Sequence, residues 1–277
     1  MADSSPTSSS QALSTESAET NLQHTQEEEV EDMDFWDHIA ELRKRLIYSI
    51  VAIAIGAIAG WYLSENTFSF LAAPFREYFG EAILIGTGPA EAFVLRLKVA
   101  VFAGAIFASP VIFYQVWLFI APGLLEEEKR YALPFVFSAS LLFFLGVSFC
   151  YVVVLPFALD FFRGQYEVLG DIEPTIRISE YLGLLIKAIL GFGVVFETPV
   201  LAFFLGKLGI ITADTLINAG RYAVIAIFFI SALLTPPDVL TQFLMAGPLL
   251  ILYGCSILIV RWTEKTETKK GDQEVDG

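Results

Sequence analysis

The chain has 277 residues, of which 55% are hydrophobic, with a formal net charge of −14 and a mean hydropathy of +0.62. A helix that crosses a bilayer needs about 20 apolar residues, and runs near that length recur along the sequence, which excludes a soluble globular domain. The alternation of a membrane barrel is absent, and helices satisfy their own backbone groups in lipid. The composition therefore predicts an all-α polytopic membrane protein.

Both ends of the chain are predicted to be disordered. Residues 1–33 are rich in Ser, Thr, Gln and Glu and contain no Lys or Arg, a composition that cannot bury enough apolar surface to fold. This acidic tail supplies much of the negative charge, so the charge describes a tail and not a binding surface. Residues 263–277 are predicted to form a second tail.

Six spans are predicted in a transmembrane domain of residues 34–262. The apolar runs cover 46–63, 99–125 with a start near Ala90, 131–162, 181–205, 223–234 and 239–260. The fifth run reaches only about 18 Å as a helix, against about 30 Å of hydrocarbon, so we expect a short span that thins the bilayer locally. Prolines within the runs predict a bent, concave bundle; they are Pro110, Pro134, Pro156, Pro199 and Pro248.

The distribution of Lys and Arg predicts that both termini are cytoplasmic. With six spans, three of these residues fall on the outer side, namely Arg76, Arg163 and Arg177. Eleven fall on the inner side: Arg43, Lys44, Arg45, Lys129, Arg130, Lys207, Arg221, Arg261, Lys265, Lys269 and Lys270. In the connections we expect an interfacial helix within 64–90 and a helix N-cap at Thr212.

A charged segment directly before the first span is the first candidate site. Asp37, Glu41 and Arg45 share one helical face at i, i+4 spacing. Glu41 also lies beside Arg43 and Lys44, where its carboxylate could accept an incoming guanidinium in bidentate geometry. The alternative is that Glu41 only offsets repulsion between the basic residues of its own helix.

Glu128 is the matching candidate on the next inner connection. Two carboxylates on neighbouring inner segments could hold two adjacent arginines. The neighbouring Glu126 and Glu127 are expected to be solvated, and a solvated Glu128 is the alternative interpretation.

Three further polar residues lie in or between the later spans. Glu197 lies inside the fourth span, where a carboxyl group is costly and therefore a functional candidate, and the adjacent Thr198 and Pro199 should open the helix. A protonated or snorkelling glutamate is the alternative. Asp238 and Gln242 lie at the hairpin before the last span, where they either contact a partner or, for Asp238, cap the helix.

Motifs of enzymes are missing from the sequence. There is no HExxH, GxSxG, P-loop or CxxC pattern. His24 and His38 lie outside the apolar runs, and Cys150 and Cys255 within them are expected to be small buried hydrophobes. We therefore predict a protein without catalytic activity, metal or cofactor.

Four motifs in one order carry a family resemblance. They are HIAELRKRL at 38–46, SPVIFYQVWLFIAP at 109–122, FETPV at 196–200 and LTPPDV at 234–239. On these motifs, residues 34–262 resemble TatC, the receptor subunit of the twin-arginine (Tat) protein translocase. The longer acidic N-terminal tail departs from the family pattern.

The resemblance implies a glove-shaped six-helix bundle in the inner (cytoplasmic) membrane with both termini in the cytoplasm. It implies binding of twin-arginine signal peptides of folded cargo proteins, and export powered by the proton-motive force. It also implies single-span Tat subunits of the TatA/TatB type as partners, self-association and no nucleic acid.

The resemblance further assigns roles to residues of the matching motifs. Glu41 and Glu128 would face the arginine pair, with Arg43, Arg45 and Phe119 on the same inner surface. Glu197 would be the polar group of the concave face, and Asp238 and Gln242 would lie at the outer hairpin. A different interpretation from the residues alone is a small proton- or ion-coupled transporter that uses Glu197 with Lys187, which predicts an inverted repeat that the sequence does not show.

Overall fold

The structure of the protein is a computed structural model. It describes residues 9–80, 83–121, 132–170, 174–234 and 239–275, with side chains from 36 to 264 within these ranges. The chain divides into two units, Met1–Tyr48 and Ser49–Gly277. Glu128 and Asp238 lie outside the described residues.

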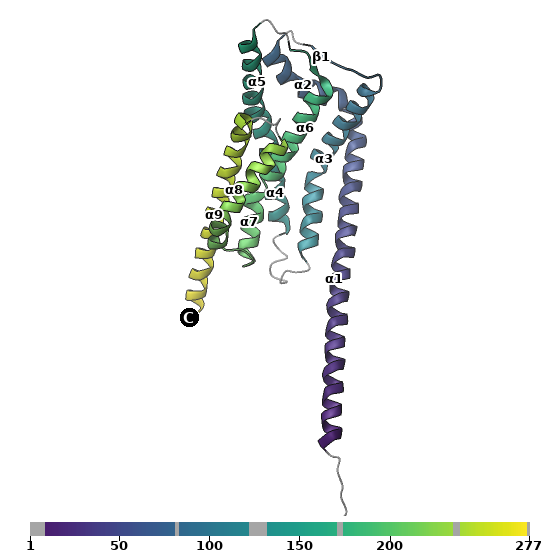
Figure 1. Cartoon of the computed structure of the whole chain (residues 1–277), viewed down its shortest axis with the longest axis vertical. Helices are drawn as coiled ribbons and strands as arrows, with labels where there is room; N and C mark the ends of the chain where they lie inside the picture. Colours follow the sequence, from purple (N-terminus) through teal and green to yellow (C-terminus); the bar gives the residue numbers. More distant parts are fainter. Residues whose placement is uncertain (1–8, 81–82, 122–131, 171–173, 235–238, 276–277) are drawn as a thin grey trace, which may run out of the picture. The chain divides into compact units, whose positions relative to one another are not determined.

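The described structure is almost entirely helical (Figure 1). Its long helices are α1 (Ser9–Tyr62), α3 (Glu91–Ile120), α4 (Ala132–Phe149), α5 (Leu155–Leu169), α6 (Ile178–Val195), α8 (Ala213–Leu234) and α9 (Val239–Val275). Shorter elements are α2 (Ser64–Phe79), the π-helix η3 (Cys150–Val154), α7 (Thr198–Lys207), β1 (Leu84–Ile85) and β2 (Ile176–Arg177). The predicted disorder of residues 1–33 and 263–277 stays a prediction.

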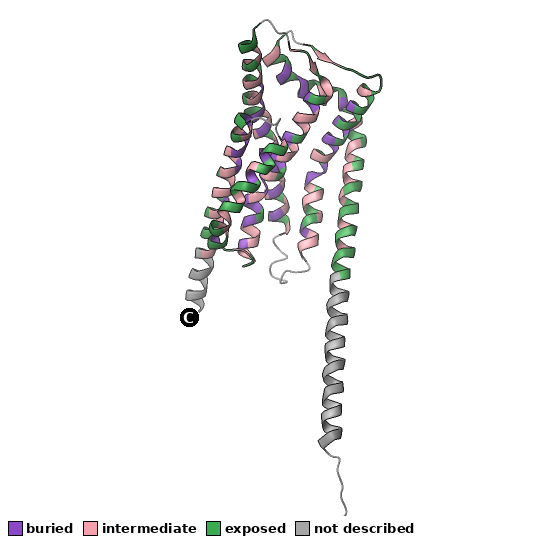
Figure 2. Ribbon diagram, viewed as in Figure 1, coloured by how far each residue is buried: buried purple, intermediate pink, exposed green. Residues whose placement is uncertain are grey.

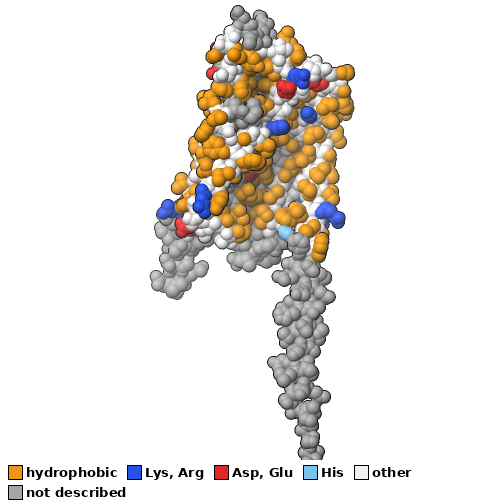
Figure 3. All heavy atoms as spheres, in the orientation of Figure 1, with side chains coloured by type: hydrophobic (Ala, Val, Ile, Leu, Met, Phe, Trp, Pro, Cys, Tyr) orange, Lys and Arg blue, Asp and Glu red, His pale blue; other side chains and the backbone are white. Residues whose placement is uncertain are grey.

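Six helical segments are long and apolar enough to cross a membrane, which confirms the predicted all-α six-span fold. Among the described residues they are Trp36–Tyr62, Glu91–Ile120, Ala132–Leu169, Ile178–Lys207, Ala213–Leu234 and Val239–Glu264. Figure 3 shows hydrophobic side chains over most of the visible face of residues 49–264, with charged side chains mainly toward its two ends. Such a belt matches the hydrocarbon core of a bilayer.

The predicted short fifth span is wrong. Helix α8 has 22 residues, which reach about 33 Å, so no local thinning of the bilayer is needed. The apolar run begins at Ala223, whereas the helix starts ten residues earlier at Ala213, directly after the predicted N-cap. Thr212 does cap it, because its hydroxyl oxygen accepts a hydrogen bond from the backbone N–H of Thr215 at 3.1 Å.

The third span is one long helix with an extra residue in one turn. The backbone N–H of Leu155 bonds to the carbonyl of Cys150, five residues earlier, and this π-turn stands directly before Pro156. Cys150 is fully buried, as expected, but Cys255 on α9 is exposed, so the expectation that both cysteines are buried is wrong for Cys255. An apolar run on a membrane helix includes the outward-facing residues as well as the core.

The core of the larger unit lies where α2, α3, α5 and α6 meet. The predicted helix within 64–90 exists as α2, and its Leu71 and Phe75 are buried. Tyr181 on α6 donates a buried hydrogen bond to the carbonyl of Leu71 at 2.8 Å. Figure 2 shows buried residues on α2, α3, α4 and α6.

Strands β1 and β2 join two connections that lie far apart in the sequence. They pair in parallel, with Leu84 opposite Ile176 and Ile85 opposite Arg177. We call the end of the Ser49–Gly277 unit that carries α2, β1 and β2 the α2 end (Figure 1). The pairing fixes the connection after α2 to the start of α6.

Helices α1 and α3 touch backbone to backbone through small residues. A Cβ atom placed on Gly104 would lie 2.4 Å from the backbone nitrogen of Ala57, and one on Gly60 would lie 2.5 Å from the carbonyl oxygen of Ala100. Gly56 and Gly60 stand four residues apart, as do Ala100 and Gly104. This small-xxx-small pairing lets membrane helices approach closely.

Candidate functional site

The charged segment before the first span contains an ion pair. The Arg45 guanidinium donates to the same carboxylate oxygen of Glu41, Oε1, from Nη2 at 2.8 Å and from Nε at 3.2 Å. Both side chains are partly buried, with 30% of Glu41 and 20% of Arg45 exposed. The second oxygen, Oε2, makes no hydrogen bond to a residue that the structure describes.

The other residues predicted for this surface are placed in part. Arg43 is exposed on α1, two residues from Glu41 and so on another face of the helix. Phe119 is half-buried in the last turn of α3. Glu128 lies outside the described residues. Its approach to Glu41 and Phe119 therefore stays a prediction.

Helices α6 and α7 meet at a break that contains Glu197. Phe196 and Glu197 form a turn between Val195 and Thr198, as the sequence predicted from Thr198 and Pro199. The Glu197 side chain is 6% exposed, and its Oε1 has no hydrogen-bond partner among the described residues. An unpaired carboxyl group in this position is a candidate for contact with a polar group that enters from outside the chain.

At this break a side-chain hydroxyl group donates the hydrogen bond that a backbone carbonyl would otherwise lack. Pro199 has no N–H to donate to the carbonyl of Val195, four residues earlier, and the Thr198 hydroxyl donates to that carbonyl at 2.7 Å. The same arrangement recurs in α3, where Ser109 precedes Pro110 and its hydroxyl donates to the carbonyl of Ile106 at 2.8 Å. Hydroxyl side chains commonly satisfy carbonyls freed by proline in membrane helices.

Replacing Thr198 by valine is expected to lower the free energy of unfolding by about 1 kcal/mol, because the Val195 carbonyl loses its donor while the side-chain shape is kept. Thermal unfolding in detergent micelles measures the effect. In a Pro199→Ala background the alanine N–H can take over, so Thr198→Val should then cost much less. If Thr198→Val lowered the free energy of unfolding equally in both backgrounds, the Thr198 hydroxyl would not be replacing the donor that Pro199 lacks.

At the hairpin between α8 and α9, the described residue is Gln242. Its amide Nε2 donates to the carbonyl of Phe228 at 3.0 Å. The hydrogen bond joins α9 to α8 and gives Gln242 a structural role, while its predicted contact with a partner stays a prediction. Asp238 lies outside the described residues.

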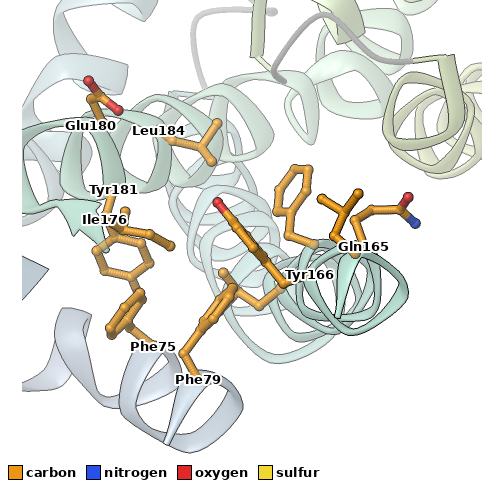
Figure 4. Close-up of a pocket in the computed structure, with 11 residues that line it drawn as sticks. Phe75, Phe79, Gln165, Tyr166, Ile176, Glu180, Tyr181 and Leu184 are labelled. Atoms are coloured by element: carbon orange, nitrogen blue, oxygen red, sulfur yellow. The ribbon is translucent and has the colours of Figure 1, made fainter. Parts of the chain in front are cut away.

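An apolar cavity of about 500 Å³ lies at the α2 end, and the sequence did not predict it. Figure 4 shows Phe75 and Phe79 of α2 facing Tyr166 of α5 across this space. The polar ends of Glu180 and Gln165 point away from it (Figure 4). The interior can therefore take an apolar group but offers few polar groups to orient one.

Comparisons with known proteins decide the family. The sequence model of the protein family "Sec-independent protein translocase protein (TatC)" matches residues 37–248 of this chain. The chain belongs to the TatC family. A TatC from Campylobacter jejuni is 43% identical over 241 residues, covering 86% of this chain and 97% of that protein. One from Desulforapulum autotrophicum is 40% identical over 247 residues, covering 89% and 90%.

A solved structure agrees with the sequence relatives. The crystal structure of the twin-arginine translocase receptor TatC superposes with a TM-score of 0.75 at 39% identity, covering 82% of this chain and 99% of that one. The resemblance inferred from the four motifs is thus confirmed. As a TatC-family member, the chain is a multi-pass membrane component of a protein translocase and not an enzyme. Membership also favours translocation over the transporter alternative.

Proposed function

We propose that the chain is the signal-peptide receptor and core subunit of a twin-arginine translocase in the cytoplasmic membrane, with both termini in the cytoplasm. Family membership supports the role. The excess of Lys and Arg on the predicted inner side supports the orientation. In this orientation the charged segment before the first span faces the compartment where cargo proteins fold.

The arginine pair of the signal peptide is bound by Glu41 and Glu128. One observation carries this proposal: Arg45 bonds to Oε1 of Glu41, and Oε2 makes no hydrogen bond to a described residue. Because Arg45 holds the carboxylate in one orientation, an incoming guanidinium meets a preorganised acceptor and loses less freedom on binding. Family membership supports Arg43, on another face of α1, and Phe119, in the last turn of α3, as further contacts of the signal peptide.

The apolar part of the signal peptide then enters the bundle beside Glu197. The buried Oε1 of Glu197 has no hydrogen-bond partner among the described residues and can accept a hydrogen bond from the signal peptide or from a partner helix. Single-span Tat subunits of the TatA/TatB type are the partners that family membership supports. Asp238 and Gln242 at the outer hairpin are proposed as contacts for them. The translocase assembles by self-association of this subunit, and transport is driven by the proton-motive force.

A peptide pull-down tests the proposal. A biotinylated signal peptide with Arg-Arg is expected to retain the purified protein at least about tenfold better than the same peptide with Lys-Lys, because lysine cannot form the bidentate pair. A peptide with the arginines intact but the apolar segment scrambled separates the two contributions. Equal retention of the Arg-Arg and Lys-Lys peptides would refute recognition by Glu41 and Glu128.

A further inference from the structure

An arginine lies near the start of helix α3, the second predicted span. Arg96 is the sixth residue of α3, about 8 Å along the axis from Glu91. This depth corresponds to the interface between hydrocarbon and lipid head groups. Its side chain is exposed, so its guanidinium can reach the level of the lipid head groups.

Two contacts fix the orientation of this guanidinium. Its Nε donates to the hydroxyl of Ser64 at 2.9 Å, and that hydroxyl donates to the carbonyl of Trp61 at 2.7 Å. Its central carbon lies 4.4 Å from the centre of the Trp61 ring, a cation–π distance. Ser64 is 3% exposed, so the guanidinium is anchored on a buried group.

The remaining donors of Arg96 point to no partner within the described structure. Its two terminal NH₂ groups make no hydrogen bond or ion pair with residues that the structure describes. An anchored guanidinium whose two terminal NH₂ groups make no hydrogen bond to a described residue is suited to a phosphate group.

Arg96 borders an apolar groove of about 350 Å³, and a carboxylate borders the same groove. The lining residues are Ser64, Glu65, Phe68, Ala92, Leu95, Arg96, Val99 and Ile178. Glu65 is exposed and forms no ion pair with Arg96 or with any other described residue. One groove thus carries a positive and a negative group that do not neutralise each other.

We propose that this groove binds a zwitterionic phospholipid with a primary amine, phosphatidylethanolamine. Its phosphate accepts hydrogen bonds from the terminal NH₂ groups of Arg96, and its ammonium group donates to Glu65. One acyl chain lies along Phe68, Leu95 and Val99. In the orientation proposed above, this lipid belongs to the outer leaflet.

Charge complementarity selects this lipid from the other common ones. Phosphatidylglycerol offers the phosphate but no cation, so Glu65 would repel it. Phosphatidylcholine offers a cation without N–H donors, so it cannot hydrogen-bond the carboxylate. The cavity between α2 and α5, although larger, has no charged group pointing into it (Figure 4) and is not expected to discriminate between head groups.

Native mass spectrometry of the purified full chain tests the site, with phosphatidylethanolamine, phosphatidylglycerol and phosphatidylcholine of identical acyl chains added in turn. We expect the first lipid to be retained preferentially. Arg96→Gln should weaken its retention about tenfold, the effect of losing charge-assisted hydrogen bonds. Glu65→Gln should abolish the preference for phosphatidylethanolamine over phosphatidylglycerol.

Lys98→Gln is the matched control, because Lys98 is an exposed cation on the same helix that does not line the groove. It should retain the lipid as the unmodified chain does. Thermal unfolding of each variant separates lost binding from lost folding, and Arg96→Lys, which keeps the charge, provides a second variant. The proposal would be overturned if Arg96→Gln retained the lipid unchanged or if Lys98→Gln lost it equally. It would also be overturned if phosphatidylglycerol bound more strongly, or if a protein helix occupied the groove instead of lipid. None of these outcomes depends on signal-peptide binding.

Discussion

Replacing Glu41 by alanine is expected to abolish cross-linking of a twin-arginine signal peptide while the amount of protein in the membrane stays normal. Glu41 is partly exposed, and its ion pair among the described residues is with Arg45 of its own helix, so its removal should leave the packing of the bundle intact. The lost charge-assisted hydrogen bonds correspond to about 1.5–3 kcal/mol of binding free energy, a loss of about tenfold to a hundredfold in affinity. A photoreactive peptide and an immunoblot of the membranes measure the two quantities.

Asp37→Ala is the matched control for this variant, because Asp37 is a carboxylate one turn earlier on the same helical face. It should leave cross-linking intact. Glu128→Ala is expected to behave as Glu41→Ala does, while Glu126→Ala is not. Retained cross-linking in both Glu41→Ala and Glu128→Ala would remove the proposed anchor for the arginine pair.

Replacing Gly104 by alanine is expected to destabilise the protein by about 1–3 kcal/mol, the cost of overpacking a tight contact. The new methyl group would lie 2.4 Å and 2.8 Å from the backbone nitrogen and Cα of Ala57. Neither atom can move away without shifting the whole of α1. Thermal unfolding in detergent, and the amount of protein that accumulates in membranes, measure the loss.

Replacing Gly220 by alanine is the control, and it is not expected to destabilise the protein. Gly220 lies within α8, and a Cβ atom placed there meets nothing within 4 Å, so the change should be neutral or stabilising by up to about 1 kcal/mol through helix propensity. The comparison separates the crossing of α1 and α3 from the general effect of a glycine in a helix. If both variants unfold at the same temperature, the backbone contact contributes nothing.

The number and order of the spans follow from the sequence, because each helix must satisfy its own backbone in lipid and so leaves a long apolar run. The length of α8 does not follow in the same way. Its first ten residues include Asp214, Asn218 and Arg221, which hydropathy assigns to a loop, although a capped helix can begin in the polar interface. The pairing of β1 with β2 involves two residues on each side, too few to leave a pattern.

Part of the candidate site could likewise be predicted from the sequence, and part could not. Glu41 and Glu197 stand out in the sequence because a carboxylate in a basic cluster and a carboxylate in a span are both unusual. The break at Glu197 follows from the proline beside it. The groove between Glu65 and Arg96 could not be predicted, because these residues lie on different helices and only the packing of α2 against α3 brings them to one surface.

The hydroxyl groups that precede Pro110 and Pro199 have a consequence for how this protein can change over evolutionary time. In each pair the ring leaves a carbonyl without its helical donor, and the hydroxyl supplies one. A substitution that removes the serine or threonine hydroxyl first leaves a carbonyl without a hydrogen-bond donor inside the membrane. A substitution that removes the proline first restores the ordinary helical hydrogen bond, and the hydroxyl is then no longer needed. Lineages that straighten these helices should therefore give up the proline before the serine or threonine.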